Sequence, residues 1–240
     1  MISPHERIIF ALDVSQRASA LEWVERLSGH VGLFKVGLEL FVSEGPSLVE
    51  EISSRGERVF LDLKFHDIPN TVAGAVRAAA SCGPFIMNLH ALAGSEAMRR
   101  AAEAAKEGAE RAGVEPAKLI AVTVLTSHTA DTLSELGIQG SPAGAVHRLA
   151  NLAKDSGIDG VVASPMEAAM VREVWPSGLI VTPGVRPAGS SLDDQSRVAT
   201  PSGAADSGAD YIVVGRPIRN AEDPVAAADA IAEELREASR

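Results

Sequence analysis

Three charged side chains fall within six residues of the stretch 60–71, which is otherwise mostly apolar up to its proline. They are Asp62, Lys64 and Asp67. In a strand, residues two apart point to the same side, so Asp62 and Lys64 would face each other. Carboxylates and an ammonium held together in a dry site could stabilise developing charge or transfer a proton. The alternative is a structural ion pair at the rim of a sheet, because charges buried in proteins are usually paired.

The residues around these charges predict a strand that turns into a helix. Apolar residues recur in a strand pattern over 59–65, Pro69 prevents the strand from continuing, and the alanine-rich run 72–80 is typical of a helix. The charges therefore fall at the carboxyl end of a strand. In α/β folds, catalytic residues gather at this end.

The whole chain repeats this alternation of strand and helix. Strands are predicted over 7–14, 33–37, 59–65, 85–91, 119–126, 160–164, 179–185 and 211–215. Main helices are predicted over 17–28, 46–55, 69–82, 94–112, 142–156, 165–174, 201–207 and 223–237, with a short extra helix over 129–136. This alternation, without a linker or a low-complexity tract, favours a (β/α)8 TIM barrel over a doubly wound α/β sheet. We expect residues 1–240 to form a single domain.

Composition narrows the classes of partner and compartment. The formal net charge of −10 argues against a nucleic acid or an anionic membrane as partner. One cysteine, Cys82, excludes an intrachain disulfide framework and a cysteine-based zinc cluster. The histidines have no pairing that suggests a metal site. The amino terminus lacks the apolar core of a signal peptide, and no segment is long enough to span a membrane. We therefore expect a cytoplasmic protein.

The pattern Asp62-x-Lys64-x-x-Asp67-Ile68-Pro69-x-Thr71 resembles the signature of the orotidine 5′-phosphate decarboxylase family. Further pieces occur in the family's order, so the resemblance covers essentially the whole chain: Ala11-Leu12-Asp13, Phe34-Lys35-Val36-Gly37, Leu125-Thr126-Ser127, Thr182-Pro183-Gly184-Val185-Arg186, Asp193-Asp194-Gln195 and Val214-Gly215-Arg216-Pro217-Ile218. It implies a (β/α)8 barrel that converts orotidine 5′-phosphate to uridine 5′-phosphate and CO2, the last step of pyrimidine (UMP) biosynthesis. It also implies a homodimer with shared active sites and no cofactor or metal.

The resemblance assigns catalysis to an array of four charges: Lys35, Asp62, Lys64 and Asp67. In the family, the last aspartate is donated across the dimer interface into the partner's site. From the residues alone, Lys35 lies in the apolar segment 33–37, where a lysine must meet a carboxylate or extend to water. Two lysines and two aspartates can neutralise one another while they hold fixed charges in a dry pocket.

The same resemblance implies residues that bind the nucleotide. The ribose would be bound by Asp13 and, across the interface, by Thr71, although either residue could simply begin a helix. Thr126, expected at the end of the fifth strand, would contact the pyrimidine ring, with Ser127 as a second candidate.

The phosphate would be bound by residues that follow the last two strands. Gly215 and Arg216 follow the eighth strand, where barrels of this kind often bind phosphate with backbone amides and a basic side chain. Arg186 and Gln195 match the family's phosphate-binding residues, with Gln195 bridging phosphate and base. They bracket the polar loop 186–197, which we expect to close over the ligand.

Three other functions are compatible with parts of this pattern. A related barrel enzyme acting on a 3-keto sugar phosphate shares the Asp-x-Lys-x-x-Asp core but would need magnesium. A Schiff-base aldolase could use Lys64 or Lys35, and borohydride trapping would reveal it. A phosphate-binding sensor has little use for two carboxylates beside an anionic ligand, which argues against a protein that only binds.

Overall fold

The computed structural model of the protein describes residues 2–187 and 199–238. Its strands close into a barrel in sequence order, with every neighbouring pair parallel and the last strand paired to the first. The strands are β1 (Ile8–Ala11), β2 (Leu33–Gly37), β3 (Val59–Phe65), β4 (Ile86–His90), β5 (Lys118–Val122), β6 (Gly160–Val162), β7 (Leu179–Thr182) and β8 (Tyr211–Val214). The predicted (β/α)8 class is therefore confirmed.

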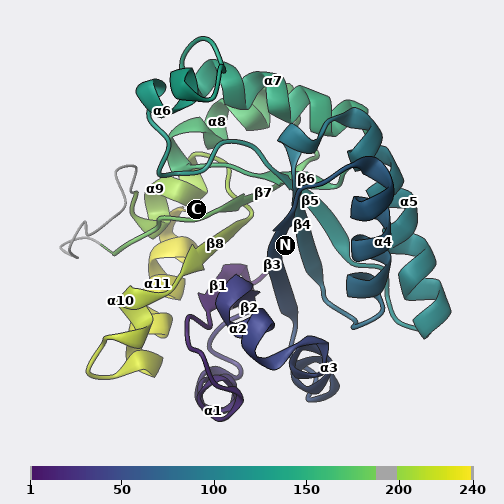
Figure 1. Ribbon diagram of the computed structural model, residues 1–240. Helices are drawn as coiled ribbons and strands as arrows, with labels where there is room; N and C mark the ends of the chain where they lie inside the picture. The colour runs from purple at the N-terminus through teal and green to yellow at the C-terminus, as the bar shows by residue number, and fades with distance from the viewer. Residues whose placement is uncertain (1, 188–198, 239–240) are drawn as a thin grey trace.

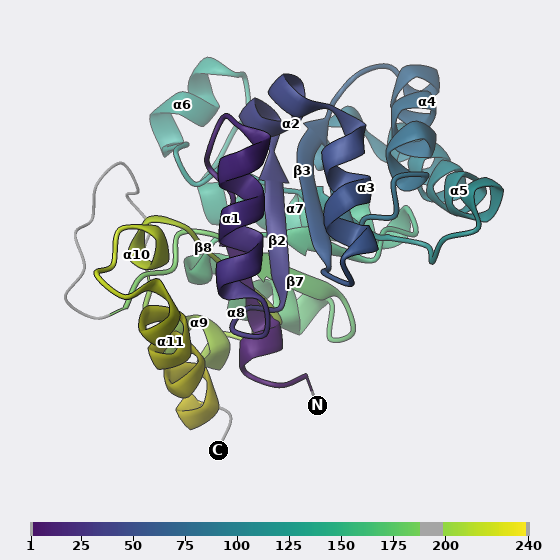
Figure 2. The same cartoon turned by 90° about the horizontal axis from the view of Figure 1, so that it is seen from below.

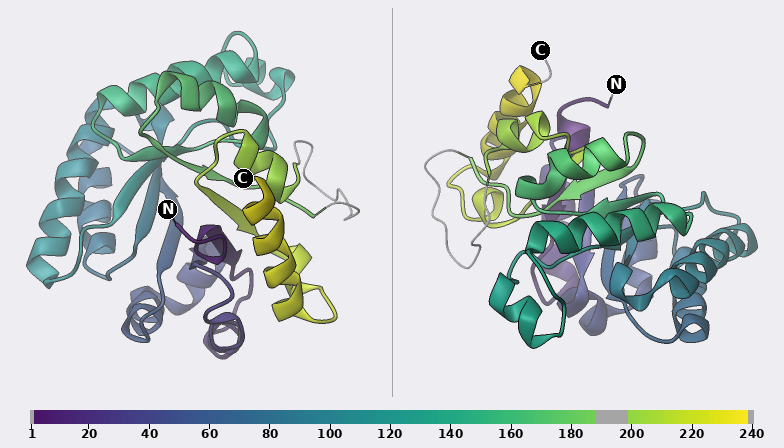
Figure 3. Two further views of the ribbon diagram at one scale, coloured as in Figure 1. Left: turned by 180° about the vertical axis from the view of Figure 1, so that it is seen from behind. Right: turned by 90° about the horizontal axis from the view of Figure 1, so that it is seen from above.

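Helices form a ring around this barrel, as Figure 1 shows. The main ones are α1 (Arg17–Leu27), α3 (Pro46–Ser54), α4 (Pro69–Ala80), α5 (Ser95–Ala112), α7 (Pro142–Asp155), α8 (Pro165–Val174), α9 (Pro201–Asp206) and α11 (Pro224–Ala238). Shorter ones are α2 (Leu38–Glu44), α6 (Ala130–Glu135), α10 (Arg216–Arg219) and the 3-10 turns η1 (His5–Arg7) and η2 (Ala91–Ala93). Helices α4 and α5 lie side by side on the outside of the barrel in both views of Figure 3. None of the helices in the described residues combines the length and apolar character needed to cross a bilayer.

Local sequence signals explain where the helices start and stop. Proline opens α3, α4, α7, α8 and α9, where its missing N–H leaves no hydrogen bond unmade. The side chains of Ser141 and Thr200 accept hydrogen bonds from the first-turn amides of α7 and α9. Helix α5 ends at Gly113 in the left-handed conformation, with φ of 67°, as its sequence predicts.

The barrel interior is apolar toward the amino ends of the strands and becomes polar toward their carboxyl ends, which form the open end of the barrel. A compact cluster with one residue from each of seven strands fills the interior toward the amino ends of the strands: Ile9, Leu33, Phe60, Ile86, Ile120, Val181 and Tyr211. Two residues further along β2, β3 and β4 lie Lys35, Asp62 and Asn88. Because side chains alternate along a strand, these three point into the same interior, one layer nearer its open end.

The structure corrects several predicted boundaries. Strand β5 ends at Val122, so Thr126 lies four residues beyond it rather than at its end. The apolar run had suggested a longer strand, but Val124 is buried in the following loop, and hydrophobicity alone does not distinguish these cases. Strand β1 likewise begins at Ile8 after η1, and β7 ends at Thr182.

Helix α2 was not predicted, and its exposure explains why. Leu40 is buried, but the apolar residues Leu38 and Val42 are 55% and 81% exposed, so the segment has no complete stripe facing the core. Figure 2, the view from below, shows α2 beside one end of β2 and β3 rather than in the surrounding ring. The four-residue helix α10, directly after β8, was also not predicted because it is shorter than a sequence pattern can reveal.

Candidate active site

A backbone irregularity in β3 directs the Lys64 side chain toward Asp62. The pairing of β3 with β4 shifts between Leu61 and Phe65, and Lys64 has a φ of 52°. It is the one non-glycine residue with positive φ among the residues that the structure describes. Strand bulges near active sites commonly redirect a side chain. The expected contact between Asp62 and Lys64 is therefore present, but a bulge produces it rather than the alternation of a regular strand.

Opposite charges alternate across the open end of the barrel. The Lys64 Nζ lies 2.6 Å from Asp62 Oδ1, and the Lys35 Nζ lies 3.7 Å from Asp62 Oδ2. On its other side, the Lys35 Nζ lies 3.3 Å from Asp13 Oδ1. Gly37 leaves room for this ammonium, because a Cβ at that position would lie 3.0 Å from Nζ. The structure therefore brings Asp13, Lys35, Asp62 and Lys64 together.

Asp62 keeps its negative charge despite burial. Burial alone would raise the pKa of its carboxyl, but the charges of Lys35 and Lys64, with hydrogen bonds from Lys64 and Asn88, outweigh it and hold the pKa below its ordinary value. The carboxylate is thus ionised at neutral pH and faces the interior of the site. A fixed charge in this position acts strongly on a bound molecule, because the Asp62 side chain is mostly buried and solvent screens it weakly.

Asn88 and His90 adjoin the array, and neither residue is among those predicted from the sequence. Asn88 is fully buried and donates from Nδ2 to Asp62 Oδ1 at 2.7 Å. Burial, followed by the charges of His66 and Lys64, lowers the pKa of His90 to about 4. His90 is therefore neutral near pH 7. The one signal for Asn88 was an uncharged polar residue two positions after Ile86 in an apolar strand.

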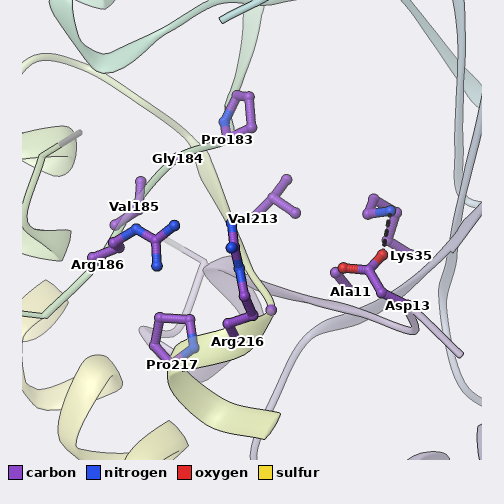
Figure 4. Close-up of a pocket in the computed structure, with 11 residues that line it drawn as sticks. Ala11, Asp13, Lys35, Pro183, Gly184, Val185, Arg186, Val213, Arg216 and Pro217 are labelled. Atoms are coloured by element: carbon purple, nitrogen blue, oxygen red, sulfur yellow. Dashed lines mark hydrogen bonds and ion pairs between the residues drawn. The ribbon is translucent and has the colours of Figure 1, made fainter. Parts of the chain in front are cut away.

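Two adjoining cavities open above these residues, and they share Lys35, Pro183 and Val213 in their walls. The first, of about 220 Å³, is also lined by Asp13, Arg186, Gly215 and Arg216. Figure 4 shows Arg186 and Arg216 on one side of it and the Asp13–Lys35 pair on the other. The second, of about 210 Å³, is lined by Asp62, Lys64, Thr126 and apolar residues of β5 and β6.

These two cavities have different chemical character. One combines two guanidinium groups with the backbone of Gly215, which suits a doubly charged oxyanion such as a phosphate. The other joins an apolar wall to the Asp62–Lys64 pair, which suits a flat ring that carries polar groups. Together they suit an elongated ligand with a ring at one end and a phosphate at the other.

Asp67 and Thr71 were predicted for the site but lie on the surface of this chain. Both are exposed, and Asp67 Oδ1 accepts a hydrogen bond from the Ile68 amide at 2.6 Å. Neither lines the two cavities. Gln195 and most of the predicted loop 186–197 lie outside the described residues.

The fold and the site define a (β/α)8-barrel enzyme with a charged pocket at the carboxyl ends of its strands. Residues 6–231 match the model of the "Orotidine 5'-phosphate decarboxylase / HUMPS family", and the chain belongs to this family. In the described residues, no three His, Cys, Asp or Glu side chains are arranged to hold a metal ion.

Several proteins named orotidine 5'-phosphate decarboxylase are similar to this chain over nearly their full length. A curated relative from Trichlorobacter lovleyi, named orotidine 5'-phosphate decarboxylase, is 52% identical over 230 residues, covering 95% of each chain. One of the same name from Halorhodospira halophila is 54% identical over 231 residues, again covering 95% of each. The crystal structure of orotidine 5'-phosphate decarboxylase from Lactobacillus acidophilus has a TM-score of 0.85 and 39% identity, covering 95% of this chain and 98% of that one.

Proposed function

We propose that this protein decarboxylates orotidine 5′-phosphate to uridine 5′-phosphate and CO2, the last step of UMP biosynthesis, in the cytoplasm and without a cofactor or metal. The observation that carries this proposal is the charged array at the junction of the two cavities. Lys64, Asp62 and Lys35 line the ring-sized cavity, and Arg186 and Arg216 line the adjoining one. The names of the relatives support the same reaction. We also propose that residues 1–240 act as one domain.

In the proposed reaction, the bond between C6 of the pyrimidine and its carboxylate breaks, and the electron pair stays on C6. Asp62 is ionised and lies against the substrate carboxylate, so departure of CO2 relieves a repulsion between two anions. The Lys64 ammonium lies where negative charge develops and transfers a proton to C6, giving uridylate. Lys35 balances Asp62 on its other side, which keeps that carboxylate charged.

The remaining predicted residues take binding roles in the same proposal. Asp13 contacts the ribose hydroxyls, and Thr126 contacts the pyrimidine ring. Arg186, Gly215 and Arg216 bind the phosphate with two guanidinium groups and a backbone amide. Gln195, which lies outside the described residues, bridges phosphate and base.

We further propose that two copies of the chain complete each other's sites. Asp67 and Thr71 follow β3, exposed, beside Ile68, which is 67% exposed. Three more exposed apolar residues follow the neighbouring strands β2 and β4: Leu38, Val42 and Leu92. Because β2, β3 and β4 are adjacent, these residues lie on one side of the open end. A second copy that covers them would bring its own Asp67 and Thr71 to the array.

A mixing experiment tests the shared site. Dimers formed from Lys64→Ala and Asp67→Asn chains together are expected to regain activity, because each mixed dimer contains one site with both native residues. Random pairing gives about a quarter of the wild-type rate. In the matched control, mixing Lys64→Ala with Asp62→Asn leaves every site defective and restores nothing. A Lys64→Ala/Asp67→Asn mixture no more active than its components would contradict shared sites.

Ultraviolet absorbance of orotidine 5′-phosphate mixed with chelator-treated protein tests the reaction itself. We expect rapid conversion to the spectrum of uridine 5′-phosphate, with no dependence on added magnesium. A protein that is inactive until magnesium and a 3-keto sugar phosphate are supplied would instead be the related sugar-phosphate enzyme. If neither substrate reacts although phosphate ligands bind, the sensor function would be supported.

A further inference from the structure

Asn88 connects the two central residues of the array. It lies on β4 and is fully buried. Its Nδ2 donates to Asp62 Oδ1 at 2.7 Å, and its Oδ1 accepts the backbone N–H of Lys64 at 2.8 Å. The orientation of the amide follows from these partners, since the Lys64 N–H can only donate and the ionised carboxylate can only accept.

The position of Asn88 matches the bulge in β3. Leu61 pairs with Met87 and Phe65 pairs with Leu89, so three residues of β3 lie opposite Asn88 alone. The Asn88 side chain bonds the Lys64 amide within this irregular segment. A left-handed backbone is unfavourable for a residue such as lysine, because its Cβ crowds the following carbonyl oxygen. The hydrogen bond that the Lys64 N–H donates to the buried Asn88 Oδ1 offsets part of that cost and favours this conformation of Lys64.

We propose that Asn88 is a positioning residue for the decarboxylation, which holds the Asp62 carboxylate and the Lys64 backbone in their reactive arrangement. This inference rests on the proposed function. Because Asn88 is fully buried, it acts through Asp62 and Lys64 rather than on the substrate. Its amide is neutral, so it fixes the carboxylate without changing the net charge of the array.

Because the proposed role requires a neutral hydrogen-bond donor at position 88, the Asn88→Asp variant tests it most directly. The variant keeps an acceptor for the Lys64 N–H but places a second carboxyl oxygen about 2.7 Å from Asp62 Oδ1, where Asn88 now has its Nδ2. Two carboxylates this close cannot both ionise easily, so the pair retains one proton to a higher pH than an isolated carboxyl. Below that pH the array carries its native charge, and above it the array gains a negative charge.

We therefore expect the kcat of Asn88→Asp to approach the wild-type value at low pH and to fall as pH rises, measured between about pH 5 and 9. Other titratable or charged groups face the new carboxyl from three strands: Lys35 on β2, Asp62 and Lys64 on β3, and His90 on β4. They are present in both proteins, so the wild-type profile is the reference. Asn151→Asp, on the outer helix α7, is the matched control and should follow the wild-type profile.

Asn88→Ala provides a second test that does not depend on the new charge. It removes both hydrogen bonds, and we expect kcat to fall by about 10²-fold, the usual effect of a displacement of about 1 Å in a reacting group. Binding of uridine 5′-phosphate should change little, which also shows that the variant is folded. A protein in which only stability depends on Asn88 would keep its kcat at a temperature where it is folded.

The outcomes separate this inference from the proposed function. An active wild-type protein whose Asn88→Asp and Asn88→Ala variants keep its pH profile and kcat would overturn the positioning role alone. A wild-type protein that does not decarboxylate orotidine 5′-phosphate would overturn the proposed function and this inference together.

Discussion

Replacing Lys64 with alanine is expected to lower kcat by at least about 10⁴-fold, since in the proposed reaction it removes both the proton donor and the cation nearest the reacting carbon. The same change should affect binding of uridine 5′-phosphate only modestly, because the arginines of the neighbouring cavity remain in place. Asp62 also keeps a cation, since Lys35 lies 3.7 Å from its Oδ2. Steady-state kinetics together with titration of uridine 5′-phosphate measure the two effects separately.

Two further variants define what the Lys64 result means. Lys106→Ala, at an exposed position on α5, removes a lysine far from the array and should leave kcat unchanged. Lys64→Gly should be as inactive as Lys64→Ala but more stable by about 1 kcal/mol, because glycine adopts a positive φ without strain. Near-normal turnover in either Lys64 variant would exclude this lysine as the proton donor.

Features of the site that depend on residues close together in the sequence could be predicted, and features that depend on distant residues could not. Strands β2 and β3 were predicted with the bounds that the structure shows, because short apolar runs between turn signals mark them clearly. The contact between Asp62 and Lys64 was predicted from their spacing alone. The bulge that produces it was not, because it involves pairing with β4, where Asn88, 24 residues away in the sequence, accepts a hydrogen bond from the Lys64 amide.

The exposure of Asp67 and Thr71 and the loop position of Thr126 were also beyond local patterns. Asp67 and Thr71 belong to the same motif as Asp62, yet they lie exposed on the surface of this chain. No periodicity in the sequence indicates whether such a residue serves its own chain or another copy. The sequence places Thr126 at a strand end because apolar loop residues resemble strand residues, whereas the structure places it in a loop that lines the second cavity.

The second large effect expected concerns the phosphate of the substrate. Orotidine, which lacks the phosphate, should react about 10²–10⁴-fold more slowly than orotidine 5′-phosphate even when each saturates the enzyme. If the two arginines that line the first cavity, Arg186 and Arg216, bind the phosphate as proposed, each would supply about 1.5–3 kcal/mol through charge-assisted hydrogen bonds. The combined energy of the two arginines corresponds to a rate difference of about 10²–10⁴-fold if that binding energy is used to hold the pyrimidine ring against the charged array.

Comparing both substrates in the wild-type protein and in Arg216→Ala shows whether phosphate binding accelerates the reaction at the ring. Arg216→Ala should slow the saturated reaction of orotidine 5′-phosphate, but it should leave that of orotidine nearly unchanged, because the nucleoside has no group for this arginine to bind. If the phosphate contributed only to uniform binding, both substrates would share one kcat and Arg216→Ala would raise KM alone. Equal saturated rates would therefore refute the coupling, and a loss of kcat confined to the nucleotide would show that remote contacts at β8 position the ring for reaction beside Lys64.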